Sequence, residues 1–503
     1  MEVYEYEQIP QILKRFSFEE KVKICQYHSR QLMEIQGLNT LSRYRHSPLP
    51  WELETFFLFS VAFKEWKNDR FSDKQKIFPR IISTIRNYDH PLLKEIIQKG
   101  NPLTTFADNL IMALSAIQFD GQEFYPYKLY RYNYYFSFRN DKIDMPQLFQ
   151  SKFGCTYSDF LLFGQFLWLL FSSHNIDFSK KLMDFIFERF NPIILQLSLT
   201  REEYIEELNS ITTNISDYLY CLRPSYSYPF IIESGNLYLP LPHLLIRSIT
   251  SSLLYRLTDS NNKLSELIGK EVLEPYLYHI IHASNIFDEV FPEQIYHIGK
   301  KEQSGKKEQR TLDVMARKGD HFIFFDSKMY TPKRDLRIFQ DNTFNDEVSR
   351  LAKACKQIYK HIHDRFPTSY NPFSDHVKID QNNVYGLVVV RDNPHIPLRH
   401  IYHKTAESLK INDDSPEFDW LCTHIGIVAI YEIEKYCFTD SDLLNAVLSR
   451  AESKRIDDHW LTSCIDQNVI VNEDVKLFKK KLGEECMNLV NDCAALGAFN
   501  KEG

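Results

Sequence analysis

Glycine is scarce in this chain: 15 of its 503 residues are glycine, whereas 37 are phenylalanine and 29 are tyrosine. Few backbone positions can therefore require a positive φ, and large aromatic rings must fill the interior. This balance favours helices over an architecture of short strands and tight turns. The length corresponds to roughly two to four domains, and an apolar share of 44 % is enough to give each of them a core.

Three sequence features argue against a secreted, disulfide-bonded or membrane-spanning protein. The nine cysteines contain no Cys-x-x-Cys pair, so neither a disulfide framework nor a zinc ribbon is predicted. The first residues, MEVYEYEQIP, are acidic and aromatic where a signal peptide is basic and then apolar. The most apolar stretch, residues 160–171, has 12 residues, and a membrane-spanning helix needs about 20. We therefore expect a cytoplasmic protein with no membrane partner, and a buried core helix at 160–171.

Four segments differ in the periodicity of their apolar residues. Residues 1–225 carry apolar side chains at intervals of three and four, which predicts an all-α N-terminal half. Residues 226–260 contain a hairpin signal, Ser234-Gly235-Asn236, and continue as a helical connector. Residues 261–440 alternate helical and two-residue patterns, which is typical of an α/β domain with a mixed central sheet flanked by helices. Residues 441–503 are expected to form helices that pack on this domain.

The most informative segment runs from Thr311 to Tyr330 and contains a two-residue turn signal, Gly319-Asp320. If these two residues form the loop of a hairpin, Asp313 and Asp326 lie directly opposite each other. Side chains alternate along a strand, so Lys328 shares the face of Asp326. The other face is predicted to be the core face and carries Leu312, Val314, Ile323 and Phe325. Two opposed carboxylates repel each other, and a divalent cation between them removes this repulsion. We therefore expect a magnesium or manganese site.

Asp313, twelve intervening residues and then Asp326-Ser327-Lys328 form a pattern that resembles the PD-(D/E)XK nuclease superfamily. Leu312 stands where the name of the motif has proline, at a position that varies in that superfamily. Its fold, a helix, three antiparallel strands, a helix and a strand, agrees with the order predicted over residues 264–391, where the first strand is expected at 294–299. The resemblance implies a restriction-endonuclease-like domain. It also implies that Asp313, Asp326 and the main-chain carbonyl of Ser327 hold the metal, and that Lys328 orients or activates the attacking water.

Two further site residues follow from the same resemblance. A glutamate on the first helix often completes the metal site in that superfamily, and the segment 269–276 (GKEVLEPY) looks like this helix. Glu274 is the corresponding residue, with Glu271 and Glu266 as alternatives. Gln357 is similar to the glutamine that Mrr-like restriction enzymes place near the active site. Glu274 is therefore predicted as a metal ligand and, with Gln357, as part of the catalytic site.

Charge is distributed unevenly along the chain. The net charge of −7 excludes a uniformly basic nucleic-acid binder. Residues 300–365, however, contain 16 Lys and Arg against 10 Asp and Glu, which provides positive charge for a phosphate backbone. Residues 299–310 are expected to form a flexible loop. The residues predicted to bind nucleic acid are Lys306, Lys307, Arg310, Arg317, Lys333 and Arg334.

The resemblance implies a magnesium-dependent endonuclease that hydrolyses phosphodiester bonds, with double-stranded DNA as the expected substrate. By analogy with Mrr-like nucleases, it also implies an effector of a bacterial anti-phage defence system. We expect residues 1–225 to sense or dock a partner, or to gate the nuclease, through a partner protein or self-assembly. An RNA-directed nuclease shares the same site. The alternative from another class is a catalytically inactive nuclease-fold scaffold that binds nucleic acid or a partner protein.

Overall fold

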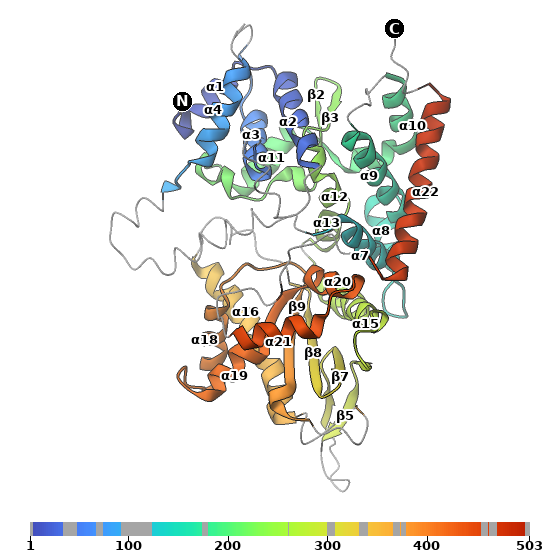
Figure 1. Cartoon of the computed structure of the whole chain (residues 1–503). Coiled ribbons are helices and arrows are strands. Elements are labelled where there is room, and N and C mark those ends of the chain that lie inside the picture. Colours follow the sequence, from blue (N-terminus) through green and yellow to red (C-terminus); the bar gives the residue numbers. More distant parts are fainter. Residues whose placement is uncertain are drawn as a thin grey trace. The chain divides into compact units, whose positions relative to one another are not determined.

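The computed structural model divides the chain into two compact units (Figure 1). The helical unit comprises Met1–Ser137, Met145–Asp259 and Phe478–Gly503. The α/β unit comprises Phe138–Asp144 and Ser260–Leu477. The structure describes residues 4–33, 48–66, 74–91, 123–173, 180–259, 261–298, 307–330, 341–365, 373, 379–453, 461 and 470–497.

The helical unit consists mainly of α-helices. Its longer helices are α2 (Phe18–Met33), α3 (Pro50–Ala62), α4 (Lys74–Arg86), α7 (Tyr125–Ser137), α8 (Met145–Phe153), α9 (Tyr157–Ser172), α10 (Lys180–Gln196) and α11 (Arg201–Ile211). Its shorter helices are η1 (Tyr6–Gln8), α1 (Ile9–Leu13), η3 (Ile215–Leu219), η4 (Pro224–Tyr226), η5 (Pro242–Leu244), α12 (Leu245–Ser248) and α13 (Ser251–Thr258). Its strands are β1 (Ser198–Thr200), β2 (Phe230–Glu233) and β3 (Asn236–Tyr238).

The three strands of the helical unit form a small mixed sheet. β2 and β3 are antiparallel, with Glu233 opposite Asn236, so Ser234 and Gly235 form the turn of the predicted hairpin. Both turn residues have positive φ, 52° and 79°, as a two-residue hairpin of the I′ type requires. β1 pairs with β2 in parallel. Because β1 lies within residues 1–225, the prediction of an all-α N-terminal half is wrong at this strand.

The apolar stretch at 160–171 forms most of α9, which confirms the predicted core helix. The Thr156 hydroxyl caps the helix by accepting a hydrogen bond from the Asp159 main-chain N–H at 3.3 Å. Phe160, Phe163 and Phe166 are fully buried. None of the helices that the structure describes is both long and apolar enough to cross a membrane.

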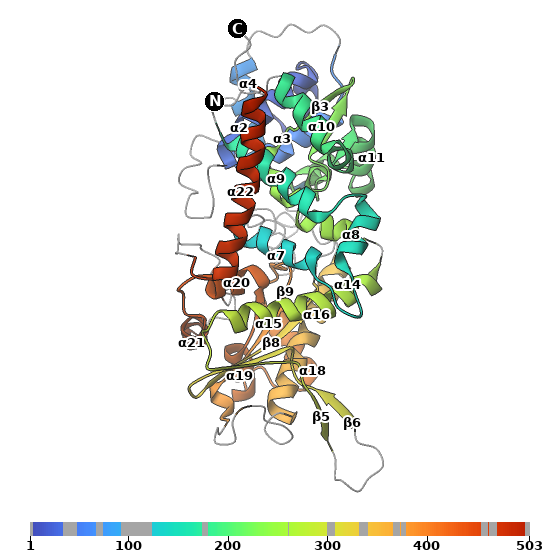
Figure 2. The same cartoon turned by 90° about the vertical axis from the view of Figure 1, so that its right-hand side faces the viewer.

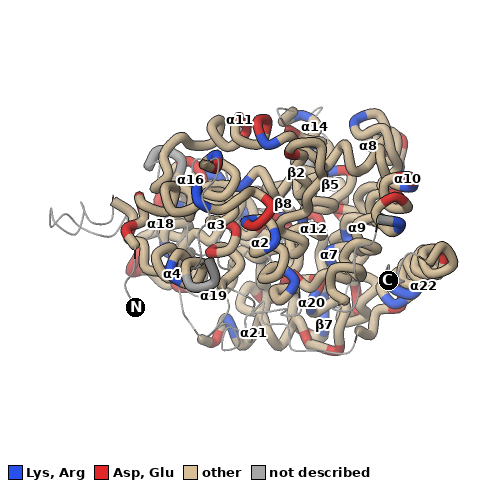
Figure 3. Tube along the Cα trace, turned by 90° about the horizontal axis from the view of Figure 1, so that it is seen from above, with Lys and Arg blue, Asp and Glu red and all other residues tan. Residues whose placement is uncertain are grey.

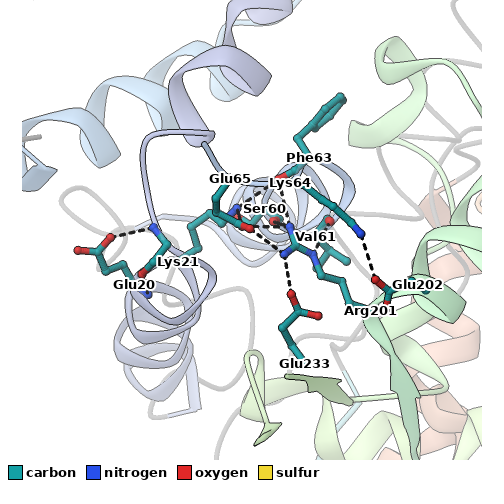
Figure 4. A network of polar contacts seen from close by, with 11 residues as sticks. Glu20, Lys21, Ser60, Val61, Phe63, Lys64, Glu65, Arg201, Glu202 and Glu233 are labelled. Carbon is teal, nitrogen blue, oxygen red and sulfur yellow. Dashed lines mark hydrogen bonds and ion pairs between the residues drawn. The ribbon is translucent and has the colours of Figure 1, made fainter. Parts of the chain in front are cut away.

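A buried ionic network joins distant segments of the helical unit (Figure 4). The Arg201 guanidinium lies between Glu65, at 2.9 Å, and Glu233, at 3.1 Å. The Lys21 ammonium also pairs with Glu65, at 2.5 Å. Burial lowers the pKa of Lys21 to about 8, against the opposing effect of Glu65. α2, the end of α3, α11 and β2 are thereby held together by charges shielded from water.

The α/β unit contains helices and two sheets. Its helices before the sheet are α14 (Asn262–Ile268), the π-helix η6 (Gly269–Leu273) and α15 (Glu274–Ala283). Its strands are β4 (Glu289–Pro292), β5 (Ile295–Ile298), β6 (Lys307–Arg310), β7 (Val314–Lys318), β8 (His321–Lys328), β9 (Val384–Val390) and β10 (Ile425–Ala429). Its later helices are α16 (Asp341–Lys360), the π-helix η8 (His361–Arg365), η9 (Gln381–Asn383), α18 (Leu398–Leu409), α19 (Pro416–His424), α20 (Ile430–Phe438) and α21 (Leu443–Ser453).

The larger sheet is mixed, as predicted, and has the strand order β10-β9-β8-β7-β4. The β4–β7 and β7–β8 pairs are antiparallel, whereas β8, β9 and β10 run parallel to one another. α15 contacts β4 and β7, and α16 contacts β8, β9 and β10. The strand expected at 294–299 does not belong to this sheet. It corresponds to β5, which pairs with β6 in an arm that extends beyond the larger sheet (Figure 2).

The arm and the larger sheet are joined through a change of register. Pro292 lies opposite Val314 in the β4–β7 pair, and Ile295 lies opposite Arg310 in the β5–β6 pair. Between these two pairs, the strand that joins β4 to β5 has two residues, and the strand that joins β6 to β7 has three residues, 311–313. One extra residue on one strand is a β-bulge, which bends the strand and redirects its side chains. The bulge therefore lies in the segment that carries the first predicted metal ligand.

The unit boundaries differ from the predicted ones in three places. Residues 226–259 belong to the helical unit instead of forming a separate connector. The end of the chain from Phe478, including most of α22 (Glu473–Ala495), also belongs to the helical unit, where Phe478 packs edge-to-face on Tyr130 at 5.7 Å. Residues 138–144, from the N-terminal half, belong to the α/β unit. Contacts between residues far apart in sequence decide these boundaries, and local composition does not reveal them.

Candidate functional site

The hairpin at the centre of the candidate site has the predicted register. Lys318 lies opposite His321 and Val314 opposite Phe325, so Gly319 and Asp320 form the turn. Gly319 has a φ of 59°, which suits a residue without a Cβ atom. The confirmed register brings the segment of Asp313 beside the last residues of β8.

Both faces of β8 are buried, contrary to the prediction of one core face and one exposed chemical face. Phe322 and Phe324, on the face of Asp326, are as inaccessible as Ile323 and Phe325 on the other face. β8 lies inside the sheet between β7 and β9, and helices contact the sheet. Polar chemistry is therefore confined to the carboxyl end of the strand, where Asp326, Ser327 and Lys328 follow the aromatic run.

The bulge directs the side chain of Asp313 toward β8. Asp313 Oδ2 accepts hydrogen bonds from the main-chain N–H of Ser327 at 2.6 Å and from its hydroxyl at 2.8 Å. The strands remain joined on both sides of the bulge: Pro292 pairs with Val314 on one side, and Thr311 donates its N–H to the Gln294 carbonyl at 2.9 Å on the other. The Asp313 side chain thus accepts the hydrogen bond of the Ser327 N–H, just beyond the last residue pair of the β7–β8 ladder. Sequence alternation alone places Asp313 opposite Asp326 but does not reveal this contact.

Asp326 is the most enclosed of the predicted site residues. Its side chain is 1 % exposed, and its Oδ2 lies 2.6 Å from Nζ of Lys328, whose side chain is 36 % exposed. Gln357, from α16, donates a hydrogen bond from Nε2 to Asp326 Oδ1 at 3.4 Å. The structure therefore brings Asp313, Asp326, Ser327, Lys328 and Gln357 together.

Burial and mutual repulsion alter the acidity of this cluster. Burial raises the pKa of Asp313 to about 7, and the charge of Asp326 adds to this shift. Burial also raises the pKa of Asp326, although Lys328 opposes the change. Burial alone would lower the pKa of Lys328, but Asp326 and Asp313 outweigh burial and hold that pKa above its ordinary value. One ammonium thus faces two carboxylates, and the negative charge is not fully balanced.

Glu274 lies close enough to share this electrostatic environment. Burial, followed by the charges of Asp313 and Glu293, raises the pKa of Glu274 to about 9. The preceding π-helix packs tightly against the strand end, because a Cβ atom on Gly269 would lie 2.9 Å from Cβ of Met329. Of the three glutamates considered from the sequence, Glu274 is thus the one whose pKa the charge of Asp313 raises.

Glu271 has partners elsewhere. Both of its carboxylate oxygens are held by the loop of residues 138–144: Lys142 Nζ lies 2.9 Å from Oε1, and Asn140 Nδ2 donates to Oε2 at 3.0 Å. Asn140 also shapes this loop, because its Oδ1 accepts from the N–H groups of Lys142 and Ile143, each at 2.9 Å. Glu266 is exposed on α14. We call the contact of Asn140 and Lys142 with Glu271 the Glu271 clamp.

Glu293 is a further acid near the site that the sequence did not reveal. It lies between β4 and β5, opposite the bulge, and its charge raises the pKa values of Glu274 and Asp326. It also forms an ion pair with Arg310 at 2.7 Å. Its position depends on the bulge and on the strand β4, neither of which has a clear local signature in the sequence.

The two predicted nucleic-acid-binding residues whose side chains the structure describes, Arg310 and Arg317, are each paired with a glutamate. Arg310 pairs with Glu293, and Arg317 pairs with Glu289 at 2.7 Å near the turn, at the other end of β7 from Asp313. Along the described trace, Lys and Arg positions are interspersed with Asp and Glu positions (Figure 3). Lys307 begins β6, so residues 307–310 form a strand instead of part of a flexible loop. Three predicted residues lie outside the described residues, namely Lys306, Lys333 and Arg334.

Carboxylate oxygens of Asp313 and Asp326 are the hard donors that magnesium and manganese prefer. Across the described ranges, three or more His, Cys, Asp or Glu side chains nowhere gather in an arrangement that could hold a metal ion. The participation of Glu274 as a third carboxylate ligand therefore stays a prediction. Comparisons of the chain with protein-family models, with curated proteins and with solved structures found no match.

Proposed function

We propose that the α/β unit is a magnesium-dependent phosphodiesterase that cleaves nucleic acid, with DNA as its substrate. The observation that carries this proposal is the convergence of a buried aspartate, Asp326, a half-buried aspartate, Asp313, and one lysine at the end of β8, where the two carboxylates repel each other. Such groups are unfavourable for stability, so their concentration in one place favours a functional role over a structural one.

The donor set fits a magnesium ion. Magnesium in nucleic-acid enzymes is commonly held by one or two carboxylates, with waters and substrate phosphates completing its coordination. Asp313, Asp326 and the main-chain carbonyl of Ser327 would hold it here, and the excess negative charge of the two aspartates favours a cation. When bound, the ion supplies neutralisation of phosphate charge and a water of lowered pKa. Manganese has the same donor preference.

The protein residues have separate tasks in this proposal. Lys328 places its ammonium beside Asp326, where it would orient the attacking water and offset phosphate charge. Ser327 orients the carboxylate of Asp313 through two hydrogen bonds. Gln357 holds the other oxygen of Asp326. Glu274, with a pKa of about 9, holds a proton at neutral pH beside Asp313 and would exchange it with groups in the site.

The test is incubation of the full chain with supercoiled plasmid, single-stranded DNA and RNA, in magnesium and in a chelator. We expect nicking or linearisation of the plasmid only with magnesium, and loss of at least about a hundredfold in rate for Asp326→Asn or Lys328→Met. Asp320→Asn, in the exposed turn of the same hairpin, is the matched control and should cleave normally. Cleavage of RNA alone would move the substrate to the RNA-directed alternative.

A second candidate function is a nuclease-fold scaffold that binds nucleic acid or a protein without cleaving it. The observation in its favour is the direct ion pair of Lys328 with Asp326 at 2.6 Å, in which the two groups neutralise each other. The same incubations separate the two functions. Retention of plasmid on the protein, with no magnesium-dependent product at any concentration, would favour the scaffold.

We further propose, by analogy with Mrr-like nucleases, that the protein acts as an effector of bacterial defence and that its helical unit docks or gates through a partner protein or self-assembly. Plating of phage on cells that express the chain or its Asp326→Asn variant tests this role. Protection that depends on Asp326 is the expected result, and equal protection by both chains would contradict a nuclease effector.

A further inference from the structure

The helical unit contains a half-open cavity of about 720 Å³ between α2, α9, α10 and the strands β2 and β3. Protein interiors rarely leave voids larger than a water molecule. A volume of this size lies instead in the range of small-molecule sites, about 300 to 1,000 Å³. A half-open cavity of this size therefore has room for a small-molecule ligand.

The two walls of the cavity differ in chemistry. α9 and α10 provide an apolar wall that consists of Leu167, Phe171, Met183, Ile186, Phe187 and Ile194. α2 provides the opposite wall, which consists of Lys23, Gln26, Tyr27, Arg30 and Gln31. These five positions follow the three- and four-residue spacing of one helical stripe. A helix stripe that faces an apolar wall is normally apolar itself, so this polar stripe points to a ligand with one polar and one apolar side.

The charge of the polar wall is positive. No Asp or Glu is among the described residues that line the cavity. Lys23 already pairs with Glu19 at 2.7 Å on the exposed side of α2. Arg30 has no carboxylate partner within the described part of the chain. Its Nε donates to the Phe171 carbonyl at 3.0 Å and its Nη2 to the Ser173 carbonyl at 2.6 Å.

These two bonds fix the Arg30 guanidinium at the end of α9, and its Nη1 donates no hydrogen bond to the residues that the structure describes. A fixed guanidinium with a remaining donor is well suited to bind an oxyanion. One uncompensated positive charge matches a single negative charge. The stripe from Lys23 to Arg30 spans about two helical turns, or roughly 11 Å, which gives room for an extended apolar chain.

We propose that this cavity binds an amphipathic monoanion, namely a carboxylic acid with a medium-length alkyl chain. The carboxylate lies at Arg30, and the alkyl chain lies against the apolar wall of α9 and α10. With this ligand, the helical unit is a small-molecule binding module. Its binding does not depend on nuclease activity in the α/β unit.

The experiment is isothermal titration calorimetry of the full chain with dodecanoate and, separately, with dodecanol, both below the concentrations at which they aggregate. We expect dodecanoate to bind with one molecule per chain and about tenfold more tightly than dodecanol. Arg30→Met should weaken dodecanoate binding about tenfold and change dodecanol binding less than twofold. Arg189→Met, an exposed arginine on α10 that does not line the cavity, is the matched control and should bind both normally.

Arg30 also bonds the end of α9, so a variant that leaves it intact is needed. Met183→Trp fills the apolar wall and should weaken binding of both ligands at least tenfold, while the thermal unfolding of the chain stays close to that of the wild type. The proposal is overturned if dodecanoate does not bind, if Met183→Trp binds it normally, or if acid and alcohol bind with equal affinity.

Discussion

At the scale of single residues, the candidate site places charged groups where their charges are costly to bury. Asp326 is buried and Asp313 is half-buried beside one lysine, and burial raises the pKa of Asp313 to about 7. Asp326 is not the exposed residue that an alternating strand predicts, because helices and neighbouring strands enclose the end of β8 as well as its middle. Substitutions here therefore affect stability as well as chemistry.

Asp313→Asn should stabilise the metal-free α/β unit at pH 8 by about 2 kcal/mol, or roughly 4 to 8 °C. The asparagine oxygen can still accept the hydrogen bonds from Ser327. A folded-state pKa of about 7 exceeds the ordinary value, so the folded chain binds the proton more tightly than the unfolded chain. The stability that the wild type gains from the proton on Asp313 is therefore present at low pH and is lost as pH rises from about 4 to 7.

The variant lacks this titration, so its advantage in melting temperature should grow across the same pH range. Differential scanning fluorimetry at several pH values measures it, with Asp320→Asn as the control. An advantage that does not change with pH would show that Asp313 does not titrate in this range.

Magnesium affinity should rise about tenfold between pH 6 and pH 8, because a metal ligand must first lose its proton and Asp313 does so near pH 7. Calorimetric titration of the full chain with magnesium chloride at both pH values measures the change. Asp313→Asn should bind weakly at both. Equal affinity of the wild type at pH 6 and 8 would contradict a role for Asp313 as a ligand.

At the scale of elements, two local irregularities shape the site. The bulge at residues 311–313 directs Asp313 to β8, and the π-helix η6 leads into Glu274 at the start of α15. Bulges and π-helices both interrupt regular hydrogen bonding and recur at functional sites. The Glu271 clamp holds the π-helix from outside and therefore positions Glu274 indirectly.

Lys142→Met should loosen η6 without unfolding the sheet. Loss of the ion pair with Glu271 removes one of the two contacts of the clamp, and we expect amide hydrogen exchange in residues 269–274 to become about tenfold faster. Exchange mass spectrometry measures this effect whether or not the chain is a nuclease. Lys152→Met, an exposed change on α8, serves as the control. Unchanged exchange in 269–274 would mean that the clamp does not support the π-helix.

At the scale of the whole molecule, the chain passes between its two units at four points, around residues 137, 144, 259 and 477. A fragment that begins at residue 260 would therefore lack the partners of Glu271 as well as the helical unit. Each unit also has its own buried polar network: Arg201 with Glu65 and Glu233 in the helical unit, and the aspartates with Lys328 in the α/β unit.

Arg201→Met should destabilise the helical unit by about 2 to 4 kcal/mol, because it leaves Glu65 and Glu233 without their shared buried partner. Exchange should accelerate in α2, α3 and α11. The neighbouring surface pair of Lys64 with Glu202 provides the control, since Lys64→Met should change stability by less than about 0.5 kcal/mol. Equal effects of the two substitutions would contradict a structural role for the buried network.

Features that depend only on neighbouring residues could be predicted from the sequence. The Gly319-Asp320 turn, the register around it and the common location of Asp326 and Lys328 follow from turn chemistry and side-chain alternation, and the structure confirms them. The core helix at 160–171 follows from its apolar composition in the same way. Each of these signals spans fewer than about 20 residues, so no distant contact is needed to interpret it.

The groups that surround that hairpin, in contrast, are set by long-range packing. Glu271 does not take the place of Glu274 in the site, because a loop about 130 residues earlier in the chain bonds both oxygens of the Glu271 carboxylate. The side-chain contact of Asp313 with Ser327 and the position of Glu293 depend on a bulge between two strand pairs. The burial of both faces of β8 depends on helices packed from elsewhere. These outcomes are set by packing between distant segments, which local periodicity and composition do not encode in readable form.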